Sequence, residues 1–283
     1  MTRMGFEEGD RIRLEDEKGR IVSFTLKRGE TFHTHKGWIK HDDVIGKPEG
    51  SIITTNSGMN YQAFTPLYPD FTLGMPRGAT IIYPKDSALI VGYGDIRSGQ
   101  KIVEAGAGSG ALSIALLKTL SERGQLLSFE ARQDFSTIAS KNVETFFGRL
   151  PENWNLQTCR LEDVEPNVLS HADRFILDML APWEHIPLAA ESLVPGGLLI
   201  VYVATTTQLS RTAEAIKEDG RFGEPESFET LLRHWHHEGL AVRPVHSMNA
   251  HTGFLTFARR NAGIQLMRRR RPAKGAYSED FQS

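Results

Sequence analysis

Three glycines at alternate positions, Gly106, Gly108 and Gly110, follow the apolar segment KIVEA and precede the helix-like segment ALSIALL. Glycines between a strand and a helix let the backbone approach a ligand at the carboxyl end of the strand. Because Ala111 fills the last place, the spacing also satisfies the dinucleotide pattern G-x-G-x-x-G/A. The loop alone therefore predicts a nucleoside-bearing ligand without identifying it.

Two carboxylates narrow the choice of ligand. Glu130 closes the next apolar segment, QLLSFE, 20 positions after Gly110, where a carboxylate can accept hydrogen bonds from ribose hydroxyls. Glu104 stands just before the glycines, so the loop resembles the pattern (D/E)-x-G-x-G-x-G of methyltransferases that use S-adenosylmethionine. A sulfonium cofactor has no pyrophosphate, so here the glycines would let backbone lie against its methionine and ribose.

Strand-like and helical segments alternate from Gln100 onward, which predicts a mostly parallel sheet covered by helices on both faces. The strand-like segments are KIVEA, QLLSFE, RFILD and LLIVYVA. After Gly220 the alternation stops, and residues 227–244 and 252–260 are predicted to form two long strands. This ending resembles the antiparallel last pair of the class I methyltransferase fold. We therefore expect a Rossmann-like α/β domain with an antiparallel last strand.

Residues 6–75 have a different sequence pattern, in which short apolar stretches are separated by Gly, Pro and Asp and helical periodicity is weak. This pattern is typical of a small β-rich domain. The expected domains are residues 1–78 (N-terminal β domain), 79–262 (methyltransferase domain) and 263–283 (a basic, disordered tail). The bridge between the domains ends in IIYPKD, and Asp86 or Ser87 is the expected cap of the next helix.

The charge balance argues against a uniformly basic nucleic-acid-binding protein, because 33 Lys and Arg stand against 35 Asp and Glu, a formal net charge of -2. A polyanionic partner would have to meet local basic patches. The candidates are Lys27, Arg28, Lys36, Lys40, Lys47 and the run MRRRR that ends at Arg271.

The remaining composition excludes several kinds of site. Cys159 is the only cysteine, which excludes an internal disulfide and a multi-cysteine zinc or iron–sulfur site. The histidine pairs His33/His35 and His234/His236 have no third ligand at suitable spacing, so we expect no metal. With neither an export signal nor an apolar run of about 20 residues, we expect a cytoplasmic protein that does not span a membrane.

Further motifs make the prediction more specific. The segments VEAGAGSGALS, MPRG with IIYPKD, LDMLAPWE, VYVATTTQLSR and RPVHSM occur in this order and at compatible spacing. Together, from about Gly5 to Arg260, they resemble the tRNA (adenine-58-N1) methyltransferases, particularly a bacterial, actinobacterial-type branch. The resemblance implies methyl transfer from S-adenosylmethionine to N1 of adenine-58 in the T-loop of tRNA, an N-terminal domain that helps to hold tRNA, and a homotetramer.

The resemblance also assigns residues to roles. Asp178 of LDMLAPWE lies at the reaction centre, and Tyr83 and Tyr202 flank the flipped base, which makes these three the candidate catalytic residues. Glu130 holds the ribose, and Ser109, Gly110, Ala111 and Leu112 line the methionine side. The candidate cofactor-binding residues are Gly106, Ala107, Gly108, Ser109, Gly110, Ala111, Leu112, Glu130, Phe135, Arg160, Asp163 and Asp178.

Two positions depart from the family pattern. Arg160 stands where an acid is expected near the cofactor adenine, so recognition of that ring falls to backbone amides or to Asp163. Phe135 stands at a position expected to be polar, so its contact with the cofactor would be van der Waals only.

The residue types suit this chemistry. N1 of adenine already carries a lone pair, so the reaction needs in-line positioning and no strong base. The methylated ring is cationic, and a carboxylate such as Asp178 would stabilise the developing charge. The base must first leave its stack and enter a pocket, which Tyr83 and Tyr202 can wall. Trp183 is either a further wall or a packing residue.

Other functions stay open at this point. The same enzyme could also methylate adenine-57. The glycine loop with Glu130 also permits a nicotinamide-dependent oxidoreductase, although no hydride-transfer site is evident. A third alternative is an RNA-binding subunit without catalytic activity, against which the intact glycines and Asp178 argue.

Overall fold

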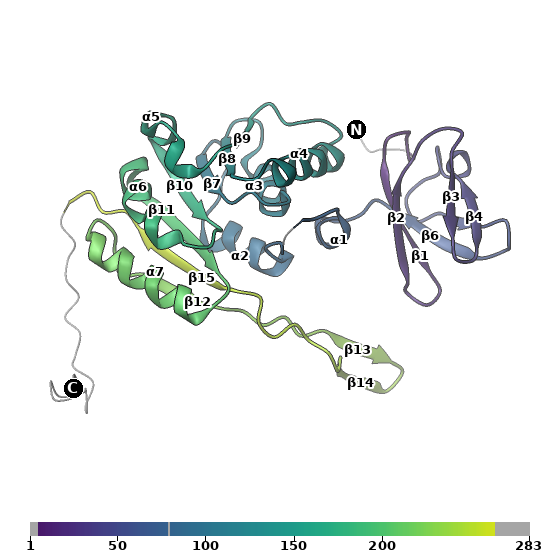
Figure 1. Cartoon of the computed structure of the whole chain (residues 1–283). Coiled ribbons are helices and arrows are strands. Elements are labelled where there is room, and N and C mark those ends of the chain that lie inside the picture. The colour runs from purple at the N-terminus through teal and green to yellow at the C-terminus, as the bar shows by residue number, and fades with distance from the viewer. Residues whose placement is uncertain (1–4, 79, 264–283) are drawn as a thin grey trace.

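The computed structural model describes residues 5–78 and 80–263. It has a small N-terminal β domain, a larger α/β domain, and a hairpin that projects from the larger domain (Figure 1). The tail predicted from residue 263 lies, from residue 264 on, outside the described residues.

The N-terminal domain is built on a four-stranded antiparallel sheet in the order β2-β1-β6-β5. Its strands are β1 (Arg11–Asp16), β2 (Ile21–Thr25), β5 (Ile52–Thr54) and β6 (Asn60–Phe64). A separate hairpin of β3 (Thr31–Thr34) and β4 (Gly37–Lys40) leads into the short helix η1 (His41–Asp43). Because side chains alternate along a strand, Ile12 and Leu14 of β1 both enter the core.

The larger domain is a seven-stranded sheet in the order β12-β15-β11-β10-β7-β8-β9. Its strands are β7 (Lys101–Ala105), β8 (Gln125–Glu130), β9 (Trp154–Thr158), β10 (Ala172–Leu177), β11 (Leu193–Val203), β12 (Glu226–Phe228) and β15 (Phe254–Arg259). Strands β7 to β11 are parallel, whereas β15 pairs antiparallel with β11 and with β12. The predicted Rossmann-like sheet with an antiparallel end is confirmed.

Helices cover both faces of this sheet. They are α1 (Tyr68–Gly74), α2 (Pro84–Tyr93), α3 (Ala111–Leu120), α4 (Gln133–Phe147), η2 (Leu161–Asp163), α5 (Pro166–Leu169), η3 (Pro182–His185), α6 (Ile186–Ser192) and α7 (Thr206–Asp219). The neighbouring β7 residues Ile102 and Val103 point to opposite faces of the sheet. Ile102 packs in the core that includes α2 and α3, whereas Val103 packs in the core that includes α6 and α7. Strands buried on both faces explain the nearly continuous apolar runs in the sequence.

The chain passes from the core of the N-terminal domain to the core of the larger domain before residue 78, the predicted domain boundary. Ala63 belongs to the core of the N-terminal domain, whereas Phe71 and Met75 pack in the core of the larger domain. Helix α1 therefore packs with the sheet that carries the glycine loop. No helix in the described ranges is both long and apolar enough to cross a bilayer.

The structure corrects the prediction of two long strands after residue 226. The segment forms the short β12 and then a separate hairpin of β13 (Trp235–Glu238) and β14 (Ala241–Pro244), before β15 returns to the sheet. We call residues 229–253, which leave the sheet after β12 and return before β15, the arm. Among the described residues, β13 and β14 pair only with each other, and they are largely exposed. They are therefore not part of the main sheet.

The expected cap of helix α2 was also wrong. The helix begins at Pro84, with Tyr83 as N-cap, and Asp86 lies inside its first turn. Proline is favoured at the first helical position because it has no N–H to satisfy and its φ already suits a helix.

Candidate active site

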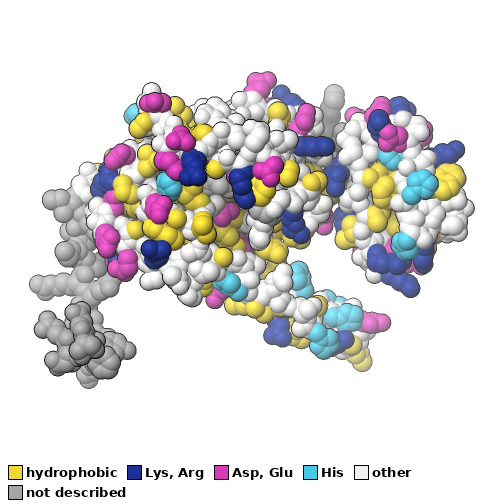
Figure 2. Space-filling view, viewed as in Figure 1, with side chains coloured by type: hydrophobic (Ala, Val, Ile, Leu, Met, Phe, Trp, Pro, Cys, Tyr) yellow, Lys and Arg dark blue, Asp and Glu magenta, His cyan; other side chains and the backbone are white. Residues whose placement is uncertain are grey.

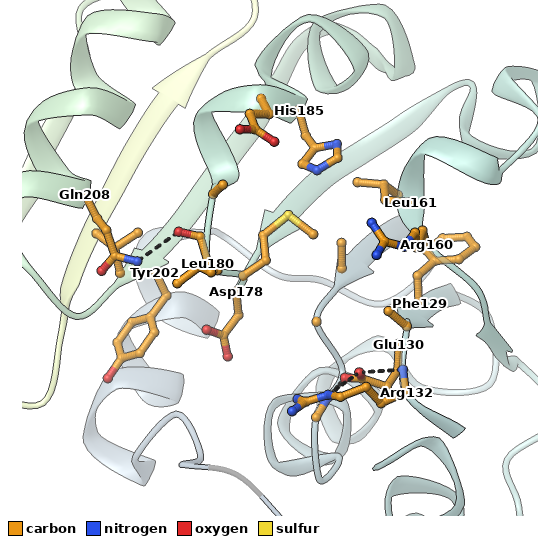
Figure 3. Close-up of a pocket in the computed structure, with 18 of the residues that line it drawn as sticks. Phe129, Glu130, Arg132, Arg160, Leu161, Asp178, Leu180, His185, Tyr202 and Gln208 are labelled. Carbon is orange, nitrogen blue, oxygen red and sulfur yellow. Dashed lines mark hydrogen bonds and ion pairs between the residues drawn. The ribbon is translucent and has the colours of Figure 1, made fainter. Parts of the chain in front are cut away.

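A cavity of about 760 Å³ opens at the carboxyl ends of the parallel strands. Each of the five parallel strands contributes to its lining at or near its last residue (Figure 3). In strand order from β7 to β11, these lining residues are Gly106, Glu130, Arg160, Asp178 and Tyr202. In an open α/β sheet this edge is where ligands bind.

Gly106 lets the ends of two strands meet. Its φ is +90°, and a Cβ at this position would overlap the backbone carbonyl of Asp178. The Asp178 N–H donates to the Ala105 carbonyl at 2.9 Å, which ties the same two chain segments together. Gly108, with φ +55°, lines the cavity, and a Cβ there would meet only the Gly106 carbonyl oxygen, at an ordinary contact distance of 3.9 Å.

Glu130 shapes the glycine loop as well as the cavity. Its Oε2 accepts the Gly108 N–H at 2.9 Å, and its Oε1 accepts the backbone N–H of Arg132 at 3.0 Å and its Nε–H at 3.3 Å (Figure 3). The carboxylate is nearly buried. Because a carboxylate has about four lone-pair sites, capacity for a ribose hydroxyl remains on the side that borders the cavity.

Three carboxylates make this end of the sheet electronegative. Glu104 is buried, and its Oε2 accepts from Ser113 at 2.7 Å and Ser128 at 2.5 Å, but its Oε1 has no partner among the described residues. Burial raises the pKa of Glu104. Asp178 keeps some exposure to the cavity, but the surrounding protein, Glu104 and Glu130 raise its pKa to about 7.

The residues at the cavity suit S-adenosylmethionine. Its sulfonium and ammonium groups are cations, and the Glu130 and Asp178 carboxylates that line the cavity would attract them. The Cβ-free Gly108 leaves room for backbone contact with the ligand. In the described part of the chain no group of three or more His, Cys, Asp or Glu side chains is arranged to hold a metal ion.

Tyr202 forms the opposite wall of the cavity. Its hydroxyl donates to the backbone carbonyl of Thr252 at 2.8 Å. Burial, followed by the nearby charge of Asp86, raises the pKa of the phenol above its usual range. A Cβ at Gly253 would overlap the Tyr202 ring, so a glycine there lets the ring pack against the backbone. In Figure 3, Asp178 lies between Tyr202 and Glu130.

The structure brings some of the predicted site residues to the cavity and places others around it. Tyr83 is half-buried at the start of α2 and is not among the lining residues. Phe135 is buried beneath the Arg132 guanidinium, 3.3 Å from its ring centroid, and against Gly78. The other predicted residues that do not line the cavity are Ala107, Ser109, Gly110, Ala111, Leu112 and Asp163. Their contacts with a cofactor stay predictions.

Several lining residues were missed by the sequence reasoning. They include Arg132, Leu161, Leu180, His185, Gln208 and Thr252. Gln208 forms a capping box with Thr205 at the start of α7 and donates to the Leu180 carbonyl at 3.0 Å (Figure 3). The spacing T-x-x-Q is a readable capping signal, but the contact with Leu180 depends on the tertiary fold. Trp183 is not among the lining residues and packs under Arg211 at 4.5 Å.

Comparisons with known proteins identify the family. The model "TrmI-like N-terminal" matches residues 5–53, and "tRNA methyltransferase complex GCD14 subunit" matches residues 63–240. The chain belongs to the GCD14 family of tRNA methyltransferases. The resemblance read from the motifs is confirmed, while its narrower actinobacterial-type assignment stays a prediction.

Relatives of this family match nearly the whole chain. The tRNA (adenine(58)-N(1))-methyltransferase TrmI of Thermus thermophilus is 32% identical over 247 residues, which are 87% of this chain and 95% of the relative. The tRNA (adenine(57)-N(1)/adenine(58)-N(1))-methyltransferase TrmI of Methanocaldococcus jannaschii is 28% identical and covers 87% of this chain and 93% of its own.

Solved structures agree with the fold. The tRNA (m1A58) methyltransferase TrmI of Aquifex aeolicus superposes with a TM-score of 0.78 at 28% identity, over 92% of this chain and all of its own. A Thermotoga maritima structure described as a SAM-dependent O-methyltransferase superposes with a TM-score of 0.86 at 29% identity. The match covers 92% of this chain and 96% of the Thermotoga chain. Family and fold thus show a methyltransferase and imply the use of S-adenosylmethionine, and the nicotinamide alternative has no support.

Proposed function

We propose that this protein transfers a methyl group from S-adenosylmethionine to N1 of adenine-58 in the T-loop of tRNA. The observation that carries the proposal is that one cavity, in a member of this family, is lined by the glycine loop and Glu130 together with Asp178 and Tyr202. The relatives named as adenine-58 methyltransferases match both domains, which supports this substrate.

The cofactor supplies an electrophilic methyl group on a sulfonium centre. Gly106 and Gly108 would contact it through backbone, and Glu130 would accept hydrogen bonds from its ribose. A cationic ligand beside Asp178 favours the ionised carboxylate. Burial, and after it the charges of Glu104 and Glu130, raise the pKa of Asp178, and a bound cation would offset this effect.

Asp178 would act on the substrate through its charge. Its carboxylate would accept a hydrogen bond from the adenine amino group and stabilise the positive charge that develops on the ring as N1 is methylated. Tyr202 would hold the extruded base against the carboxylate, and we keep Tyr83 as its partner at the start of α2. No group has to remove a proton from N1, because the lone pair is already free.

Basic side chains on the N-terminal domain support its proposed role in holding tRNA. Dark blue Lys and Arg side chains are visible on this domain in Figure 2. The candidates Lys27, Arg28, Lys36 and Lys40 are exposed there, and Lys40 lies 5.9 Å over the Trp38 ring. Because phosphate contacts release counterions, we expect tRNA affinity to fall steeply with salt.

The arm supports the proposed homotetramer. Large apolar side chains are exposed along it, where Figure 2 shows yellow and cyan side chains together. They are Leu231, Leu232, Trp235, Leu240, Val242, Val245 and Met248. A projecting hairpin with this composition is suited to burial against another copy of the chain.

Incubation with methyl-labelled S-adenosylmethionine and unmodified tRNA, followed by mapping of the product, tests the function. We expect 1-methyladenosine at position 58 and none in a tRNA that carries guanosine there. Label at adenine-57 as well would establish the second specificity that the Methanocaldococcus relative's name records. Label on an oxygen atom, or none on tRNA, would contradict the proposal.

A further inference from the structure

The two ends of the arm are fastened together where they meet the α/β domain. The contacts of His251 with Ala204 and Glu229 raise its pKa and so favour the ring protonated on both nitrogens. In this form Nδ1 donates to the Glu229 carboxylate at 2.8 Å, which joins the returning end to the outgoing end. Nε2 of the same ring donates to the Ala204 carbonyl, which follows β11, at 2.7 Å. The base of the arm is therefore attached to the chain segment that follows Tyr202.

A buried ion pair on helix α2 contacts the base of the arm as well. Asp86 is 1% exposed; its Oδ1 accepts from Lys85 Nζ at 2.6 Å, and its Oδ2 accepts from Thr252 Oγ1 at 2.6 Å. Lys85 Nζ also donates to Thr252 Oγ1 at 2.7 Å and approaches Thr230 Oγ1 at 3.5 Å. Lys85, Asp86 and Thr252 thus form a closed triangle of hydrogen bonds, which we call the clamp.

The clamp continues directly into the cavity wall. Thr252 lines the cavity, and its carbonyl accepts the hydrogen bond from the Tyr202 hydroxyl at 2.8 Å. The next residue, Gly253, packs against the Tyr202 ring. A displacement of Thr252 would therefore move both the hydrogen-bond acceptor and the packing surface of Tyr202.

A role for Asp86 within helix α2 alone does not explain its hydrogen bond to Thr252. An acid in the first turn of a helix interacts favourably with the helix dipole, but both carboxylate oxygens of Asp86 are engaged by Lys85 and Thr252. A buried ion pair often contributes little net stability, because desolvation of the charges offsets their attraction. Its directional contacts nevertheless fix the position of the groups that it joins.

We propose that Lys85 and Asp86 are positioning residues for methyl transfer, which fix Thr252 and through it the Tyr202 wall against which the substrate base is held. The inference rests on the proposed function. It assigns to the YPKD segment a task beyond that of Tyr83: the segment connects helix α2 to the base of the arm and sets the shape of the substrate side of the cavity.

The test compares T252V with T252S, together with D86N. Valine keeps the shape of threonine but removes the hydroxyl, whereas serine keeps the hydroxyl. We expect T252V and D86N to slow single-turnover methylation by about 10-fold or more, with unchanged affinity for S-adenosylmethionine by calorimetry, and T252S to stay close to the wild type.

A matched control removes a buried charge elsewhere in the same domain. Asp219 at the end of α7 is 5% exposed at its side chain and paired with Arg221, and neither residue lines the cavity. D219N should lose stability without slowing turnover. Hydrogen exchange of the peptide 251–257 should become faster in T252V and D86N and stay unchanged in D219N.

The outcomes separate the two proposals. A wild-type protein that methylates no tRNA overturns the proposed function and the positioning role with it. An active wild type overturns this inference alone if T252V turns over as fast as T252S, or if D219N is slowed as much as D86N. If D86N does not fold, the T252V and T252S pair still decides the question.

Discussion

At the scale of single residues, Asp178 shows a conflict between folding and function. The surrounding protein and two neighbouring carboxylates favour its neutral form when no ligand is bound, whereas the proposed reaction needs its negative charge. A cationic cofactor resolves the conflict, because it favours the charged form. Asp178 is therefore destabilising by itself at neutral pH and useful in the complex.

The charge of Asp178 can be separated from its shape. D178N keeps the size of the side chain and one acceptor but removes the charge. We expect it to fold and bind tRNA normally, and to methylate at least ~100-fold more slowly in single turnover at saturating cofactor, the typical loss of one preorganised electrostatic interaction. A near-normal rate would remove Asp178 from the mechanism and leave positioning by the tyrosines.

The same residue predicts a pH dependence of stability. The pKa of Asp178 is about 7 in the folded protein, against an ordinary value of 3.8 that applies to the unfolded chain. Between pH 3.8 and pH 7 the folded state therefore binds the proton more tightly than the unfolded state does. The free energy of unfolding therefore falls as the pH rises from 4 to 7. Because the cavity partly solvates the carboxyl group, we expect a loss of roughly 1 to 2 kcal/mol, which is less than the full pKa shift implies.

Thermal melts of cofactor-free wild type and D178N from pH 4 to 8 measure this effect. Above pH 7, D178N should melt a few degrees higher than the wild type, and the two should converge near pH 4. Parallel curves over the whole range would show that Asp178 does not titrate in this window.

At the scale of elements, the site depends on how closely the ends of the parallel strands approach. Strands β7 and β10 are neighbours, and the carbonyl of Asp178 after β10 occupies the space that a side chain at Gly106 would need. Gly108 also has a positive φ, but it faces the open cavity. Gly106 is therefore required for the packing of the two strand ends, whereas Gly108 leaves space for the ligand.

Alanine at each position separates these two tasks. G106A should destabilise the cofactor-free protein by about 2–4 kcal/mol, because strain and overlap act together. G108A should cost only the ~1–2 kcal/mol of a left-handed alanine, yet it should weaken S-adenosylmethionine binding. Melting temperature and calorimetry measure the two effects, and equal stability losses in the two variants would contradict this assignment.

At the scale of the whole molecule, the arm projects away from the α/β domain (Figure 1). Several of its large apolar side chains are exposed. Leu240 and Val242 at its end have few contacts to lose, so acidic replacements there should leave the monomer folded. If the arm joins copies of the chain, L240E/V242E should sediment as a smaller species than the wild type. L150E, at an exposed leucine in the loop after α4, is the control, and an unchanged assembly in L240E/V242E would contradict the role of the arm.

The sequence by itself determined the features that depend on local pattern. The glycine loop with Glu104, the alternation of strands and helices, and Glu130 at the end of the second parallel strand follow from periodicity and spacing, because each strand and its following loop are encoded by adjacent residues. Asp178 and Tyr202 could be assigned because their motifs resemble a known family, and both line the cavity.

Only the tertiary structure decided which distant segments meet. The hydrogen bond between Asp86 and Thr252 joins positions 166 residues apart, and no local signal distinguishes Asp86 as its partner from Asp86 as a helix cap. The arm was predicted as part of longer strands because strand propensity does not reveal the pairing partner, which depends on packing against the rest of the sheet. The wall behind Tyr202 was therefore invisible in the sequence, since three chain segments must fold together before it exists.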